Sequence, residues 1–134
     1  MASGLAAAYA AVRGAVAGAG LSQPISWFND PFTPPAAAEW LAVRFVGGDG
    51  RPVTQAPTAG NERHALLQLD IYEPDNAGDG AALALADTLS TLFSRANLYP
   101  VLFDVAAVPK VAPSDQFGWQ RLTLTVPFAV EETA

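Results

Sequence analysis

The stretch ALLQLDIY, residues 65–72, alternates between aliphatic and mostly polar side chains. Its odd positions hold alanine, leucine, leucine and isoleucine, whereas Gln68, Asp70 and Tyr72 occupy even positions. Successive side chains of a β-strand point to opposite faces of a sheet, so this pattern predicts a strand with one buried face. The second face of such a strand is either wet or packed against a partner.

Two further stretches repeat the alternation: WLAVRFV at 40–46 and WQRLTLTVPFAV at 119–130. Three strands with the same one-sided pattern are typical of an antiparallel sheet that is covered on one face. We also expect a brief strand at 25–29 and a fuller one at 99–108, from which Asp104 would join the polar face. The polar side chains gathered on the uncovered face are Arg44, Gln68, Asp70, Tyr72, Arg121, Thr123 and Thr125.

Two helices are predicted, because residues 2–21 and 80–97 both carry apolar side chains at helical spacing. The first is rich in Ala and Gly and poor in large core residues. The order helix, strands, helix, strands segregates the helices to one face of a sheet, which is the α+β pattern. We therefore expect a single α+β domain over residues 1–134, with a mainly antiparallel four- to five-stranded sheet and two helices packed on one face.

The segment GGDGRPVTQAPTAGNE, residues 47–62, is rich in Gly and Pro and predicts a long loop. Loops of this length without secondary structure are usually functional or become ordered on binding.

Four carboxylates lie within QLDIYEPDNAGDG, residues 68–80, and raise the question of a metal site. An EF-hand loop that started at Asp75 would place Ala77 at its third position and Ala86 at its twelfth, where oxygen ligands are required. The glycines and the proline of the stretch instead favour a joint between a strand and a helix, with Asp79 as the helix cap.

The composition argues against several classes of function. The net charge is −6, and the seven basic residues are scattered singly, unlike the clustered cations of a nucleic-acid-binding protein. The absence of cysteine removes disulfides, thiolate zinc sites and a cysteine nucleophile. His64 is the only histidine, and no Gly-x-Ser-x-Gly motif accompanies it. The sequence therefore predicts no enzyme, no metal site and no cofactor.

The apolar N-terminal segment predicts neither a signal peptide nor a membrane span. No basic residue precedes Leu5, as a signal peptide requires, and Arg13 lies in the middle of the segment. We expect no membrane association.

Four stretches together resemble the small tail-terminator-like proteins of long-tailed bacteriophages. The stretches are SWFNDPFTPP (26–35), WLAVRF (40–45), LDIYEPDNAGDGAALALADTL (69–89) and WQRLTLTVPFAV (119–130). They carry a Pro-Phe-Thr-Pro loop, a strand, a second strand that turns into a helix, and a last strand that closes on Val-Pro-Phe. The resemblance extends over nearly the whole chain, and PFTPP is its most particular motif.

The resemblance implies a structural virion protein, a tail terminator that forms a ring, usually a hexamer. Such a ring caps the finished tail tube and meets the head-completion or neck proteins, so these proteins and further copies of the chain are the implied partners. DNA would pass through the lumen without being specifically bound, which suits an acidic chain. The protein would assemble in the host cytoplasm and reside in the tail of the virion.

In such a ring, the polar sheet face and the loop at 47–62 are the expected contacts between subunits. The loop would be mobile in a single subunit and become ordered against a neighbouring subunit or the end of the tube. The candidate interface residues are Arg44, Arg51, Asp70, Tyr72, Arg121 and Thr123. Two alternatives stay open: another neck or head–tail connector protein, and a soluble α+β ligand-binding domain with a Trp-lined pocket.

Overall fold

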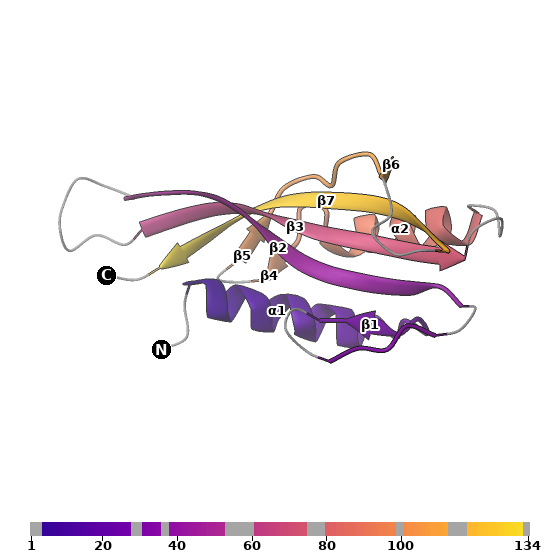
Figure 1. Ribbon diagram of the computed structural model, residues 1–134. Coiled ribbons are helices and arrows are strands. Elements are labelled where there is room, and N and C mark those ends of the chain that lie inside the picture. Colours follow the sequence, from indigo (N-terminus) through magenta and orange to yellow (C-terminus); the bar gives the residue numbers. More distant parts are fainter. Residues whose placement is uncertain are drawn as a thin grey trace.

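The computed structural model describes residues 4–27, 31–35, 38–52, 61–74, 80–98, 101–112 and 118–132. The described part has an α+β fold, in which two helices accompany one open sheet (Figure 1). The elements are α1 Gly4–Gly18, β1 Ile25–Ser26, β2 Trp40–Pro52, β3 Asn61–Pro74, α2 Gly80–Phe93, β4 Asn97–Leu98, β5 Val101–Phe103, β6 Lys110–Ala112 and β7 Trp119–Glu132.

The sheet has seven strands in the order β1-β2-β3-β7-β5-β4, and β6 pairs with β7 off this path. β1 runs parallel to β2, whereas the other described pairs are antiparallel. The mainly antiparallel α+β fold is confirmed, but the expected four to five strands are too few. The unforeseen strands β4 and β6 contain two and three residues. Such short strands show no alternation in a sequence.

β2, β3 and β7 form the long centre of the sheet. β3 pairs with β7 along its whole length, from Asn61 opposite Glu132 to Pro74 opposite Trp119. Figure 1 shows these three strands projecting together beyond α1. The central strand of this projection, β3, has a hydrogen-bonded neighbour on both sides.

The predicted loop at 47–62 is wrong at both of its ends. Residues 47–52 belong to β2 and residues 61–62 to β3, while 53–60 lie outside the described residues. A register shift between Val46 and Asp49 accommodates the Gly-Gly pair. Backbone hydrogen bonds do not depend on side chains, and a bulge absorbs glycine in a strand, so a Gly-rich sequence extends the hairpin here.

β5 is much shorter than the predicted strand at 99–108 because it meets a proline on β7. Phe103 lies opposite Phe128, and the next backbone bond runs from the Asp104 N–H to the Pro127 carbonyl at 2.8 Å. Pro127 has no N–H with which to continue the ladder. The regular pairing of β5 with β7 therefore ends after the bond from Asp104 to Pro127.

α2 ends at Phe93, four residues before its predicted end at 97. Arg95 adopts a left-handed conformation with φ of 58°, and its N–H donates to the Asp104 carbonyl at 3.0 Å instead of to the helix. A left-handed residue is a common way to end a helix, but glycine is its usual occupant. The sequence therefore gave no local stop signal.

Both helices and one sheet face contribute to a single hydrophobic cluster. The aliphatic positions predicted for the long strands are buried in it, so the one-sided alternation is observed. Its buried members are Ala8, Val12, Val16, Leu41, Val43, Leu67, Leu69, Ile71, Ala82, Leu85, Ala86, Leu89, Phe93, Val101, Phe103, Leu122, Leu124, Val126, Phe128 and Val130.

α1 reaches this cluster through small side chains. Ala8, Val12 and Val16 are buried at a spacing of four residues, which places them on one stripe of the helix. Beside the stripe, Tyr9 meets Trp27 edge-on, with 6.1 Å between the ring centroids. Neither α1 nor any other helix of the described residues is long and apolar enough to cross a membrane.

Candidate functional site

The sheet face that points away from the helices, which we call the outer face, contains a buried carboxylate. The side chain of Asp70 is 1% exposed. The Thr123 hydroxyl donates to its Oδ1 at 2.8 Å, and Gln68 Nε2 donates to its Oδ2 at 2.9 Å. The strand register explains this arrangement, because Asp70 lies opposite Thr123 on β7 and two residues from Gln68 on β3.

Two arginines approach the same carboxylate from neighbouring strands. Arg44 Nε and Arg121 Nη1 each lie 3.8 Å from Asp70 Oδ2, and their side chains are 48% and 22% exposed. A buried charge is costly unless it is paired and hydrogen-bonded. Asp70 therefore holds two guanidinium groups between the sheet and the surface. One negative charge shared by two positive charges leaves this region with a positive excess.

Four aromatic side chains cover one end of the outer face, and we call them the aromatic cover. Trp40 stacks on Tyr72 with 4.1 Å between centroids and 9° between planes. Phe32 and Trp119 flank Trp40 at 5.0 and 6.1 Å. Trp40 Nε1 is buried without a hydrogen-bond partner among the described residues. Phe32 belongs to the PFTPP motif, so this motif contributes to covering the sheet.

Five of the six candidate interface residues lie together on the outer face, in neighbouring register positions. Asp70, Tyr72 and Thr123 are buried by the chain itself. Arg44 is exposed and Arg121 half-buried, so of these five the arginines have the side-chain surface that another molecule could contact. A role of these residues in subunit contact stays a prediction.

Arg51 and Asp104 lie apart from this cluster. The backbone of Arg51 pairs with Glu62 towards the far end of the β2–β3 hairpin, and its side chain is outside the described part. Asp104 was expected to join the polar face from its strand, and it does so at a distance from Asp70: its N–H bonds to Pro127, which is four residues from Thr123 along β7 and therefore about 13 Å away. The register of β5 on β7 places it at the other half of the sheet.

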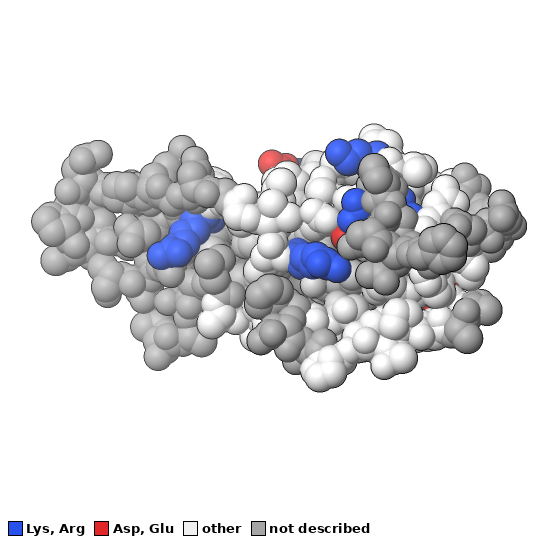
Figure 2. All heavy atoms as spheres, in the orientation of Figure 1, with Lys and Arg blue, Asp and Glu red and all other residues white. Residues whose placement is uncertain are grey.

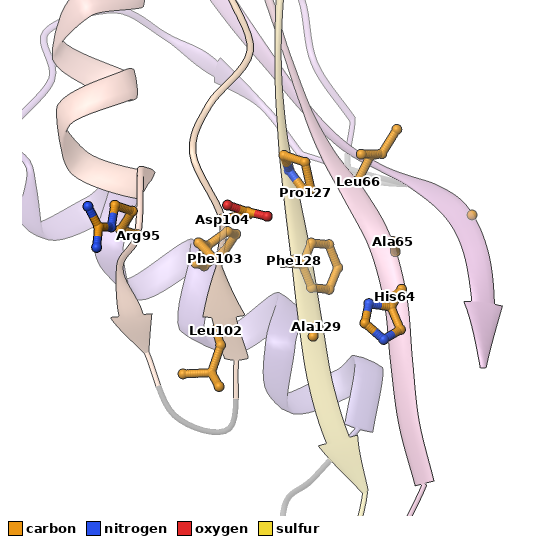
Figure 3. Close-up of a pocket in the computed structure, with 11 residues that line it drawn as sticks. His64, Ala65, Leu66, Arg95, Leu102, Phe103, Asp104, Pro127, Phe128 and Ala129 are labelled. Carbon is orange, nitrogen blue, oxygen red and sulfur yellow. The ribbon is translucent and has the colours of Figure 1, made fainter. Parts of the chain in front are cut away.

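A groove of about 690 Å³ hollows this other half (Figure 3). Leu66 in its lining is four residues from Asp70 on β3, and Pro127 is four residues from Thr123 on β7. Side chains an even number of residues apart on a strand point to the same face, so both lining residues lie on the outer face. Arg95 and Asp104 stand on one side of the groove and His64 on the other. The lining residues are Gly47, His64, Ala65, Leu66, Arg95, Leu102, Phe103, Asp104, Pro127, Phe128 and Ala129.

One face of the described part presents mostly basic side chains among its charged residues. The chain has 13 acidic and seven basic residues. On the face turned to the viewer in Figure 2, blue atoms of Lys and Arg form several patches, and few red atoms of Asp and Glu appear among the described residues.

The residues considered for catalysis and metal binding do not assemble into a site in the described part. His64 lies in β3 opposite Ala129 and is half-buried. Within the described ranges, no group of three or more His, Cys, Asp or Glu residues could hold a metal ion. The proposed cap Asp79 lies in the undescribed stretch 75–79, which separates the end of β3 from the start of α2.

The sequence did not predict the groove or the aromatic cover. A signal for the groove was present, since Val46 and Leu66 interrupt the polar side of their strands with aliphatic residues. No local pattern of the sequence indicates the aromatic cover, because the contact of Phe32 with Trp40 depends on how the chain runs between them.

Comparison with known proteins gives a family. A model of the phage tail terminator protein family matches residues 6–128. No curated protein matches the chain. A solved structure whose title states no function matches 93% of this chain and 96% of its own, with 18% identity and a TM-score of 0.59, and supports the fold. The match over residues 6–128 shows that the chain belongs to the phage tail terminator family, and thus to the structural proteins of the phage tail.

Proposed function

We propose that this chain is a ring-forming subunit, in a hexamer, that caps the finished tail tube and joins it to the head. Its membership of the family supports this role. We infer the subunit contact from the surroundings of Asp70, whose buried carboxylate holds two arginines at the surface of the sheet. Cations that are fixed in this way lose little conformational freedom on binding an acidic neighbour.

Within this proposal the candidate interface residues have different tasks. Arg44 and Arg121 contact the neighbouring subunit, and Asp70 and Thr123 hold them in position. Tyr72 stiffens the adjoining end of the sheet through its stack on Trp40.

Arg51, towards the end of the hairpin, is proposed as a separate contact to the acidic surface of a neighbour. The backbone pairing of β2 with β3 carries this position well beyond the Asp70 cluster.

The ring would contact the tail tube protein on one side and the head-completion or neck protein on the other. A chain with net charge −6 suits a lumen through which DNA passes without specific binding. Assembly would take place in the host cytoplasm, and the ring would remain in the virion.

Light scattering on the purified chain and electron microscopy of tails test the proposal. A ring-sized species, and tails that stay uncapped and headless when the protein is withheld, are the expected results. Arg44→Glu combined with Arg121→Glu should reduce both ring formation and capping. Tails that join heads normally without the protein would rule out the terminator role.

A further inference from the structure

The two arginines beside Asp70 have N–H groups for which the described part provides no acceptor. Each approaches Asp70 Oδ2 only to 3.8 Å, which is longer than a hydrogen bond. The carboxylate oxygens already accept from Thr123 and Gln68. Arg121 Nε is buried without a hydrogen-bond partner among the described residues. A buried donor without an acceptor is costly, so the site favours a further acceptor.

Lys110 adds a third cation to this site. It is exposed on β6 opposite Thr123, which makes it a diagonal neighbour of Arg121 at about 7–8 Å between Cα atoms. Glu73, the next carboxylate of β3 after Asp70, is three residues further on and therefore alternates to the opposite face. The cationic cluster, as we call it, has a net charge of +2 and consists of Arg44, Asp70, Lys110 and Arg121. Such a cluster suits a further carboxylate.

The end of the projection formed by β2, β3 and β7 has the opposite charge. Four acidic and two basic residues occupy its strand positions, and we call them the acidic end: Asp49, Arg51, Glu62, Arg63, Glu131 and Glu132. The register places Glu62 directly opposite Glu131, and Glu132 follows on β7. Like charges at directly opposite positions are unfavourable, so this end gains when a cation approaches.

The cationic cluster and the acidic end are too far apart to meet within one chain. Glu62 and Asp70 are eight residues apart on β3, which is about 27 Å of extended strand. Figure 1 shows that the projection extends beyond α1, so this helix does not cover its end. A second copy of the chain therefore offers each surface a partner of complementary charge.

We propose that the acidic end of one subunit binds the cationic cluster of the next, and that its carboxylates accept from Arg121 and Lys110. The inference rests on the proposed ring and names the two surfaces that meet in it. A contact between two different surfaces is heterologous, and repeated copies close into a ring when the rotation between them closes.

Charge reversal tests the pairing. Sedimentation velocity over a concentration series measures self-association of the wild type and of each variant. Lys110→Asp and Glu131→Lys should each weaken association about tenfold or more. The double variant Lys110→Asp/Glu131→Lys exchanges the charges and should recover most of the wild-type association, as should an equimolar mixture of the single variants.

Arg95→Asp and Asp87→Lys are the matched controls, because they make the same changes of charge at exposed sites outside both surfaces. Aspartate tolerates the left-handed backbone at position 95. Both controls should associate as the wild type does, and thermal melts check that every variant folds.

Association that survives both single reversals, or a double variant that does not recover, overturns the inference and leaves the ring in place. A wild type that is monomeric at every concentration also overturns it. Duplex DNA is the competing polyanion for the cationic cluster. Binding of DNA that Lys110→Asp abolishes, with self-association unchanged, would assign the cluster to DNA and overturn the inference as well. Failure of the proposed function is read separately, from head joining on tails that lack the protein.

Discussion

Thr123 donates its hydroxyl hydrogen to the Asp70 carboxylate at 2.8 Å, and both side chains are buried on the outer face of the sheet. Thr123→Val keeps the shape of the side chain but removes the donor. We expect the free energy of unfolding to fall by about 1.5–3 kcal/mol, the range for a hydrogen bond to a charged group. Chemical denaturation measures the change. Thr125→Val, at the next outward position of β7, should cost less than about 1 kcal/mol, and equal losses at the two sites would contradict the prediction.

Asp70→Ala should be at least as destabilising as Thr123→Val, because it leaves Arg121 half-buried without its carboxylate. Breaking a fully buried ion pair costs about 3–5 kcal/mol, and the exposure of Arg44 lowers the expected loss to about 2–3 kcal/mol. A double-mutant cycle with Arg121→Leu checks the coupling by denaturant unfolding. Strictly additive losses would show that the two side chains do not stabilise each other.

Leu89→Ala should lower the free energy of unfolding by about 2–5 kcal/mol, because Leu89 is fully buried in the cluster between α2 and the sheet. Leu83→Ala on the same helix is the control, and at its exposed site it should cost no more than about 0.5 kcal/mol. Urea unfolding of both variants measures the two losses in the free energy of unfolding. Similar midpoints would mean that α2 does not cover the core.

Arg95→Gly should leave the stability unchanged or raise it by up to about 1 kcal/mol. The left-handed backbone costs a non-glycine residue roughly 1–2 kcal/mol, and the entropy of glycine offsets part of the relief. A β-branched Arg95→Val should lower the melting temperature instead. Calorimetry of the three chains provides the ranking, and a clear loss of stability in Arg95→Gly would mean that the Arg95 side chain supports the fold.

Gly14→Ala should raise the free energy of unfolding by about 0.5–1 kcal/mol, since Gly14 is exposed in α1 and a Cβ there would meet no atom within 4 Å. Gly118→Ala has equally open space, but its φ of +84° should make the change destabilising by about 1–2 kcal/mol. Thermal unfolding followed by circular dichroism compares the two. Opposite signs are expected, and a loss in both would count against an ordinary helix at Gly14.

The features that sequence reasoning obtained were those encoded in local periodicity. The alternation of Leu67, Leu69 and Ile71 identified a half-buried strand, and these residues are buried together in the core. The same alternation brought Asp70, Thr123 and the two arginines to one face before any pairing was known. Each of these inferences needs only the period of two of an extended chain.

The features that it missed depend on contacts between distant segments. β5 stops early because Pro127 faces it on another strand. The hairpin runs through residues 47–52 because β3 offers backbone partners that a Gly-rich segment can use as well as any other. Phe32 covers Trp40 only once the segment that joins them has folded. None of these partners lies within a local window of sequence.

The position of β7 also has a consequence for synthesis of the protein. β7 is translated after the other described strands, yet it lies between β3 and β5 in the sheet. The β2–β3 hairpin and α2 leave the ribosome before the strand that completes their core. Pairings between segments that are distant in sequence form slowly. Completion of the sheet is therefore a late event, and until then the aliphatic faces of β2 and β3 remain accessible to chaperones.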